Sequence, residues 1–221
     1  MNLSSHISFF NTKSRYPRQV VSANWFERMQ ALEEDVNLFC WKRSIDKQIV
    51  DYLEKCVHKG VESISFSTTM EELPANMSRI RTKWDPDHRL DADAFWIDVY
   101  RLVNDFLAFS ESASGKVHLK VVGDNACTKF HTDGYRLRLF TTYVGRGTEW
   151  LPEDAVNRTA LGTHNKNIFK NEFRIQRIKT GHVSILKGEA PNQPQSVRGI
   201  VHRSPQINDT GEKRIILRVD I

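Results

Sequence analysis

The sequence predicts an α+β protein in which a helical first half is packed on a β-rich second half. In the first half of the 221 residues, apolar side chains recur three or four positions apart, whereas from Val117 onward they alternate and β-branched residues accumulate. Turn-forming stretches separate these short β segments without an intervening helical pattern. Because no linker separates the halves, we expect a single domain over 1–221. Residues 1–114 would be mainly helical support, and 115–221 a sandwich, barrel or jelly roll.

Three helices and one strand are expected in the first half. Each helix is predicted by one apolar stripe and a preceding residue that could cap its N-terminus. The predicted helices, with their candidate caps, cover 25–39 (Ser22 or Asn24), 45–56 (Ser44) and 95–109 (Asp91). The second helix should end near Gly60. Strict alternation at 63–67 predicts a short strand.

Six strands are expected in the second half, where period-two patterns and β-branched residues coincide. The predicted strands cover 117–122, 136–144, 173–179, 183–186, 199–202 and 214–219. Such a series without intervening helices is typical of a sandwich, barrel or jelly roll.

Composition excludes several classes of protein. The chain has 39% apolar and 27% charged residues, an ordinary globular balance. The net charge of +5 permits anionic partners, but no dense basic block or nucleotide fingerprint predicts nucleic-acid binding. The three cysteines form no C-x-x-C pair, which favours a reducing compartment. No apolar run approaches the roughly 18 residues of a membrane span, and no signal peptide is evident. We therefore expect a soluble cytoplasmic protein without a membrane partner, and its oligomeric state is not predicted.

A histidine and an acid in the second half could bind a metal ion. His131 and Asp133 are two positions apart, and in a strand such residues share a face about 6.6 Å apart. His202, at the end of a later predicted strand, is the candidate third ligand. Two histidines and one carboxylate form the facial triad of non-haem iron(II) oxygenases, which leaves coordination positions for a 2-oxo acid and dioxygen. Arg214 in the last strand could bind the far carboxylate of that acid.

The spacing of His131 and Asp133 is weak evidence by itself. Eight histidines and 27 acidic residues predict about one such pair by chance in a chain of this length. The order of the elements adds weight, because the pair, the later histidine and the arginine each fall at a strand or its end. The alternative is that these are solvated or hydrogen-bonded polar residues at strand ends.

Several segments resemble a known family. They are CTKFHTD (127–133), RLFTTYVGRGTEWLP (138–152), GHVSILKG (181–188) and HRSP (202–205). They are similar to the bacterial family called domain of unknown function 1826, and the resemblance extends from about residue 39 to the C-terminus. This resemblance implies membership of a family but no activity.

The same segments are similar, more distantly, to the double-stranded β-helix oxygenases that use Fe(II) and 2-oxoglutarate. That resemblance implies a jelly-roll, cupin-like β-helix in 115–221, with His131, Asp133 and His202 as metal ligands. Arg214 would anchor 2-oxoglutarate, Arg138 is a further candidate for binding it, and Arg218 ranks behind Arg214 as the anchor. Relatives often have Gly-Asp where this chain has Gly181-His182. The candidates for lining the pocket are Tyr143, Trp150 and His182.

The expected function is therefore that of a 2-oxoglutarate-dependent dioxygenase that hydroxylates a substrate carbon and releases succinate and carbon dioxide. An alternative from another class is a non-redox, cupin-like protein that handles zinc or another divalent metal with the same three ligands. A third is a β-helix that binds no metal and acts as an interaction module. Whether the chain is an enzyme is left open at this point, and no motif identifies the substrate.

Overall fold

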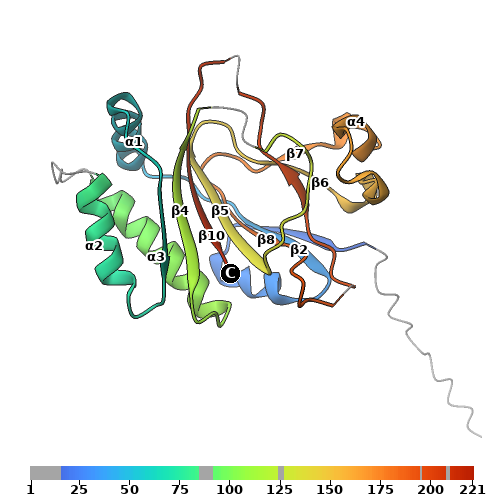
Figure 1. Cartoon of the computed structure of the whole chain (residues 1–221), viewed down its shortest axis with the longest axis horizontal. Coiled ribbons are helices and arrows are strands. Elements are labelled where there is room, and N and C mark those ends of the chain that lie inside the picture. Colours follow the sequence, from blue (N-terminus) through green and yellow to red (C-terminus); the bar gives the residue numbers. More distant parts are fainter. Residues whose placement is uncertain (1–15, 85–91, 124–126, 195, 208–209) are drawn as a thin grey trace, which may run out of the picture.

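Helices cover one face of a large β-sheet, and a smaller sheet lies against its other face (Figure 1). The computed structural model describes residues 16–84, 92–123, 127–194, 196–207 and 210–221. The α-helices are α1 (Lys47–Lys59), α2 (Leu73–Trp84), α3 (Asp93–Phe109) and the short α4 (Asn165–Ile168). In Figure 1, α1, α2 and α3 lie on one side of the large sheet. The small sheet lies on the other side, and α4 lies beyond it. None of the described helices is long and apolar enough to span a bilayer.

The strands are divided between a seven-stranded and a three-stranded sheet. The large sheet has the order β1-β2-β8-β5-β10-β4-β3, and the small sheet has the order β7-β6-β9. Neighbouring strands run antiparallel except β1 and β2, which are parallel. The bounds in the large sheet are β1 Arg18–Ser22, β2 Val36–Trp41, β3 Ile64–Thr68, β4 Gly115–Val122, β5 Leu137–Val144, β8 Val183–Lys187 and β10 Arg214–Asp220. Those in the small sheet are β6 Glu149–Leu151, β7 Gln176–Arg177 and β9 Val201–Arg203.

Alternation along the central strands separates two cores. One face of β10 carries Ile215, Leu217 and Val219, which belong to the large apolar core shared with α1, α2 and α3. The other face carries Ile216, which packs with residues of both sheets such as Phe140. The members of this inner core are Leu38, Cys40, Val122, Phe140, Ile178, Leu186, Ile200 and Ile216. On β10, charged residues stand on either side of Ile216, so the space between the sheets holds buried polar groups as well as apolar ones.

The helices predicted at 45–56 and 95–109 are confirmed as α1 and α3. Helix α1 begins two residues later than expected, because Asp46 rather than Ser44 provides the cap: its carboxylate accepts a hydrogen bond from the Gln48 backbone N–H at 2.9 Å. The helix ends at Gly60, whose φ of 72° is the left-handed conformation that favours glycine. The Asp91 cap predicted for α3 lies outside the described residues.

The helix predicted at 25–39 is wrong beyond Leu32. Trp25–Leu32 forms a 3-10 helix, and Val36–Trp41 is strand β2. Strand β2 pairs with β1 on one side and β8 on the other, and five of its six residues are buried. A strand that is buried on both faces has no alternating polarity, so its apolar residues were compatible with a helical stripe. Together with β3, which confirms the strand predicted at 63–67, and β1, it gives the first half a β component, so this half is not mainly helical.

Most of the strands predicted in the second half are confirmed. The predictions at 117–122, 136–144, 183–186, 199–202 and 214–219 correspond to β4, β5, β8, β9 and β10. The prediction at 173–179 is wrong over most of its length, since Glu172–Arg174 is a 3-10 turn and only Gln176–Arg177 pairs. The Asn171 side chain accepts a hydrogen bond from the Phe173 N–H, which starts the turn. Strand β6 and helix α2 were not predicted.

Candidate metal centre

Two histidines from distant parts of the chain form a backbone pair at the edge of the small sheet. The N–H of each residue, His131 and His202, donates a hydrogen bond to the other's carbonyl at 3.0 Å. A pair that exchanges both hydrogen bonds brings the two alpha carbons to about 5.5 Å. The imidazole rings are consequently neighbours, with centroids 4.6 Å apart. His131 therefore lies beside β9 at the outer edge of the small sheet and pairs with it at this one residue.

Each of the two imidazole rings presents Nε2 to the same space. His131 Nδ1 lies 2.8 Å from the Lys129 carbonyl oxygen, and His202 Nδ1 lies 3.2 Å from that of Ile200. Carbonyl oxygens only accept hydrogen bonds, so Nδ1 must carry the proton in both rings. Each Nε2 then has a free lone pair, which is the arrangement of histidines that bind metals.

Asp133 completes the cluster and leaves one carboxylate oxygen without a hydrogen bond. Its Oδ1 lies 3.8 Å from His131 Nε2, and its Oδ2 lies 3.4 Å from His202 Nε2. Three ligand atoms, one from each residue, all lie within 4.8 Å of one another. Oδ2 is buried and has no hydrogen-bond partner among the described residues. A buried carboxylate oxygen without a partner is costly, and a cation between these three side chains would remove that cost.

The charge state of His202 suits metal binding. Burial lowers its pKa to about 4, and the neighbouring Asp133 carboxylate only partly opposes that shift. His202 is therefore neutral at pH 7, and a metal does not have to displace a proton from it.

A chain of buried polar side chains continues behind Asp133 to the edge of the large sheet. Arg138 Nη1 donates to Asp133 Oδ1 at 2.5 Å, and its Nε donates to Asp220 Oδ1 at 2.5 Å. Asp220 Oδ2 lies 3.5 Å from His118 Nε2, and His118 Nδ1 is hydrogen-bonded to the Ser65 hydroxyl at 2.7 Å. These contacts fix the Asp133 carboxylate from one side and leave Oδ2 facing the histidines. Arg138 was predicted as a candidate for binding 2-oxoglutarate. In the structure its guanidinium group is hydrogen-bonded to two carboxylates of the chain itself, those of Asp133 and Asp220.

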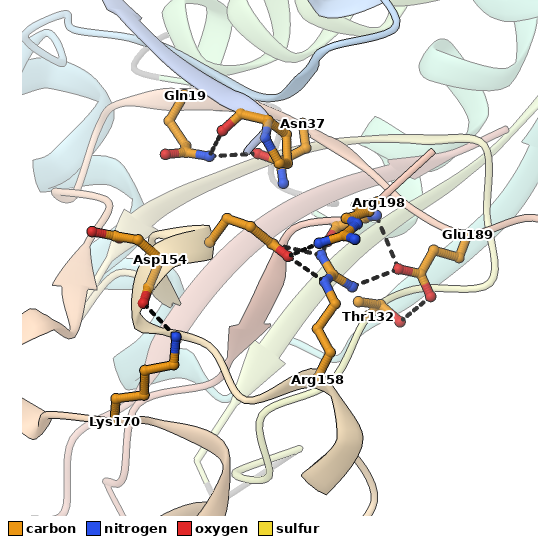
Figure 2. Close-up of polar contacts among 11 residues, drawn as sticks. Gln19, Asn37, Thr132, Asp154, Arg158, Lys170, Glu189 and Arg198 are labelled. Carbon is orange, nitrogen blue, oxygen red and sulfur yellow. Dashed lines mark hydrogen bonds and ion pairs between the residues drawn. The ribbon is translucent and has the colours of Figure 1, made fainter. Parts of the chain in front are cut away.

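Glu189 connects the two segments that carry the candidate metal ligands (Figure 2). Its carboxylate accepts hydrogen bonds from the Thr132 hydroxyl at 3.1 Å and from the Gly199 N–H at 3.0 Å, and its own N–H donates to the Asp133 carbonyl at 2.7 Å. Arg158 donates to the same carboxylate at 2.8 Å. Thr132 lies between the ligands of the first segment, and Gly199 precedes the segment that carries the third.

Arg158, which lies in the segment between β6 and β7, links Glu189 to a second carboxylate, which is buried. Its guanidinium binds Glu153 through two hydrogen bonds, at 2.6 and 2.7 Å, and also donates to the Gly199 carbonyl at 2.7 Å. Arg198 adds a contact to Glu153 at 3.2 Å. Figure 2 shows Arg158 reaching Glu189, with Arg198 nearby. A cavity of about 510 Å³ opens beside these charged groups, and its lining includes Glu189, Pro191, Pro194 and Val197.

Gly188, the last residue of the GHVSILKG segment, lies where a side chain would not fit. A Cβ at this position would lie 2.1 Å from the Tyr135 carbonyl oxygen and 2.6 Å from that of Asp133. Only glycine therefore lets the end of β8 approach the Asp133 segment closely enough for the Glu189 contacts.

Arg214 is almost completely buried and forms no ion pair within the described part of the chain. Its side chain is 1% exposed, and it donates to the Arg146 carbonyl at 2.6 Å and to the Thr142 hydroxyl at 3.4 Å. Burial lowers its pKa to about 10. It lies six residues from Asp220 on the same inner face, or about 20 Å along β10. A buried guanidinium without a carboxylate partner is suited to an anionic ligand.

The three residues expected to line the pocket lie in different places. Trp150 is paired with His202 in the small sheet, which puts the two side chains on one face of it. His182 lies in the turn before β8, with its Nδ1 3.9 Å from the Cys40 sulfur. The Tyr143 hydroxyl donates to Asp98 of α3 at 2.7 Å, so this side chain lies on the helical side of the sheet, away from the histidines.

Two residues of the centre were not identified from the sequence. Asp220 could have been found, because it lies two residues from Arg218 and six from Arg214 and so shares a strand face with both. Glu189 gave no signal, since it lies in a turn-forming stretch where an acidic residue is ordinary.

Comparisons with known proteins identify the family and the fold of the chain. Residues 28–220 match the family described as "Protein of unknown function (DUF1826)". No curated protein matches the sequence. Among solved structures, dioxygenase for auxin oxidation 1 from Arabidopsis thaliana, in complex with 2-oxoglutarate, is similar with a TM-score of 0.50 at 10% identity, over 93% of this chain and 91% of that one. The rice enzyme of the same description gives a TM-score of 0.49 at 11% identity, over 92% and 82%. At such identities the likeness shows the fold alone, a double-stranded β-helix.

Proposed function

We propose that this chain, which belongs to the DUF1826 family, is a non-haem iron(II) oxygenase that uses 2-oxoglutarate. The observation that carries the proposal is the convergence of His131, Asp133 and His202, with a free Nε2 on each ring and a buried Asp133 oxygen that lacks a hydrogen bond. Two imidazoles and one carboxylate on one side of an ion leave its other side open, as oxygenase chemistry requires.

The residues present fit such an ion. Iron(II) bound by these ligands would supply the activation of dioxygen, coupled to oxidation of 2-oxoglutarate to succinate and carbon dioxide and to hydroxylation of a substrate carbon. The contribution of the chain is to orient the ligands. The Lys129 and Ile200 carbonyls fix the two rings, and Arg138 fixes the carboxylate.

The inner face of the large sheet supports binding of the cosubstrate. Arg214 is buried, carries a positive charge without an ion pair among the described residues, and has the Thr142 hydroxyl beside it. A guanidinium and a hydroxyl together can bind a carboxylate with charge-assisted hydrogen bonds. We assign the distal carboxylate of 2-oxoglutarate to this pair. The inner apolar core around Phe140 and Ile216 would limit the access of water to the space between the sheets.

The experiment that tests the proposal measures succinate formation from 2-oxoglutarate under air, with and without added Fe(II). The assay contains ascorbate, a two-electron reductant that takes the place of the unidentified prime substrate by reducing the second oxygen atom to water. The wild-type protein should form succinate only with Fe(II), because the metal supplies the activation of dioxygen. The His202→Ala and Asp133→Asn variants should lose both activity and bound metal. His58→Ala, which alters an exposed residue near the end of α1, should match the wild type and serves as the control.

The same donor set also suits zinc, which is the basis of the alternative function. Metal analysis of protein purified without added metal distinguishes the two. Stoichiometric zinc combined with no measurable affinity for 2-oxoglutarate in the iron-loaded protein would refute the oxygenase and favour non-redox metal handling.

A further inference from the structure

Positively charged side chains gather on the inner face of β4 and β10 beside the metal centre. Arg218 is directly opposite His118 in the register of the two strands, and Lys120 is opposite Ile216. Alternation puts Lys120, His118, Arg218 and Asp220 on one face, the same face as the apolar inner core residue Ile216. Arg138 joins them from β5, opposite Asp220.

One carboxylate, that of Asp220, is shared by most of these groups. Arg138 binds it at 2.5 Å, Arg218 Nε lies 3.0 Å from it, and His118 Nε2 lies 3.5 Å from it. Arg138 also binds Asp133, so its charge is matched. The contact of Arg218 is an ion pair without hydrogen-bond geometry, and its Nε is buried with no hydrogen-bond acceptor in the described chain. The guanidinium of Arg218 is therefore available to a second acidic group.

Lys120 adds a second positive charge on this face. Among the described residues, no acidic side chain forms an ion pair with it. It is a diagonal neighbour of Arg218, at a distance where like charges repel. Burial lowers the pKa of Lys120, and the charge of Arg218 lowers it further. Two cations on one inner face, one of them with a buried and unsatisfied N–H, are stabilised by an anion placed between them.

The proposed iron and cosubstrate do not supply that anion. An Fe(II) ion and a 2-oxoglutarate dianion cancel in charge. Of the described inner-face residues near them, Arg138, Arg214, Arg218, Lys120 and the exposed Lys116 are basic, while Asp133 and Asp220 are acidic, so the loaded site keeps an excess of positive charge. Arg214, at the far end of β10, is the group assigned to the cosubstrate, which leaves Arg218 and Lys120 to the substrate.

We propose that Arg218 and Lys120 form an anion-binding subsite for the prime substrate, which is a molecule bearing a carboxylate or phosphate group near the carbon to be oxidised. This inference rests on the proposed oxygenase function and deepens it, because it names the chemical class of the substrate. The arginine fork would bind two oxygens of the acidic group, and the lysine would add a point charge beside it.

Equilibrium binding of two small probes, acetate and methyl phosphate, tests the inference. Calorimetry is carried out without oxygen on protein loaded with Fe(II) and saturating 2-oxoglutarate, so that Arg214 is occupied. At least one probe should bind the wild type, and Arg218→Gln and Lys120→Gln should each raise its dissociation constant about 10-fold or more. Arg218→Lys should recover part of the loss. The probe that binds more tightly identifies the acidic group as carboxylate or phosphate. Arg101→Gln, which removes a charge from an exposed position of α3, should change nothing.

The outcomes separate this inference from the function on which it rests. If the wild-type protein fails to bind Fe(II) or 2-oxoglutarate before any probe is added, the oxygenase proposal fails and takes the subsite with it. If it binds both but neither probe binds, or the probes bind all variants equally, the subsite alone is refuted. If Arg218→Gln weakens 2-oxoglutarate rather than the probes, Arg218 is the cosubstrate anchor and the assignment is overturned. Should Arg218→Gln unfold, as thermal melting would show, Lys120→Gln at its partly exposed position decides the question.

Discussion

Glu189 offers the sharpest test of how the chain holds its metal ligands. Replacing it with alanine removes the acceptor for the Thr132 hydroxyl, the Gly199 N–H and Arg158, while leaving the three ligands themselves unchanged. The Thr132 and Gly199 contacts are the ones that connect the His131–Asp133 segment to the segment before His202. Without them, the His131–His202 backbone pair still joins the two segments, but the segments can shift relative to each other, so the ligand atoms converge less closely.

The magnitude follows from the contacts that are lost. Two hydrogen bonds from uncharged donors to this partly exposed carboxylate, at about 1 kcal/mol each, set the scale. The ion pair with Arg158 adds little, because the Glu189 side chain is 38% exposed and solvent screens it. We expect metal affinity to fall about 10- to 100-fold, as for other groups that orient metal ligands. Global stability should fall by only about 1–2 kcal/mol, because Glu189 lies outside the large apolar core.

The assay is a competitive titration of Fe(II) or Mn(II) against a chelator, paired with thermal unfolding of the metal-free protein. Glu189→Gln keeps an oxygen for Gly199 and should lose less affinity than Glu189→Ala. Glu172→Ala, at an exposed position, is the control. Unchanged metal affinity in Glu189→Ala, with the protein folded, would show that Glu189 does not position the ligands.

Three further predictions concern the groups around the centre. Asp220→Asn should weaken metal binding about 10-fold or more in the same titration, because Arg138 loses the carboxylate that orients it toward Asp133; unchanged affinity would exclude this route. Arg214→Gln should raise the dissociation constant for 2-oxoglutarate about 10-fold or more while metal affinity stays within twofold, and equal loss of both would mean that Arg214 acts on the fold. The metal-free protein should lose up to roughly 3 kcal/mol as the pH falls from 6.5 to 4, because His202, with its pKa near 4, is held neutral in the fold and the unfolded chain binds a proton first. Denaturant unfolding measured across that range checks this, and His202→Gln should flatten the dependence.

The sequence was sufficient to select the three candidate ligands that the structure brings together, because the selection depends on residue type and on the order of strands along the chain. His131, Asp133 and His202 each carry a side chain that binds metals, and the later strands were recognisable from their alternation. Their convergence required the β9 pairing of His131 with His202, which no local pattern encodes.

Other features could not be predicted, for identifiable physical reasons. Strand β2 is buried on both faces in the middle of the large sheet, so it lacks the polarity signal of a strand. Tyr143 follows the alternation of β5 to the helical side, where Asp98 of α3 accepts its hydroxyl, and this contact depends on a partner 45 residues away. Glu189 acts through hydrogen bonds to backbone groups of other segments, which leave no trace in composition or spacing.

The central claim is that His131, Asp133 and His202 bind one metal ion whose remaining positions accept 2-oxoglutarate. A crystal structure of the protein with Mn(II) in place of iron and with 2-oxoglutarate tests it most directly. It should show the ion about 2.0–2.3 Å from both Nε2 atoms and from an Asp133 oxygen, chelated by the 2-oxo acid whose far carboxylate contacts Arg214. An ion bound elsewhere, or a fourth protein ligand that closes the position needed by the 2-oxo acid, would contradict the account.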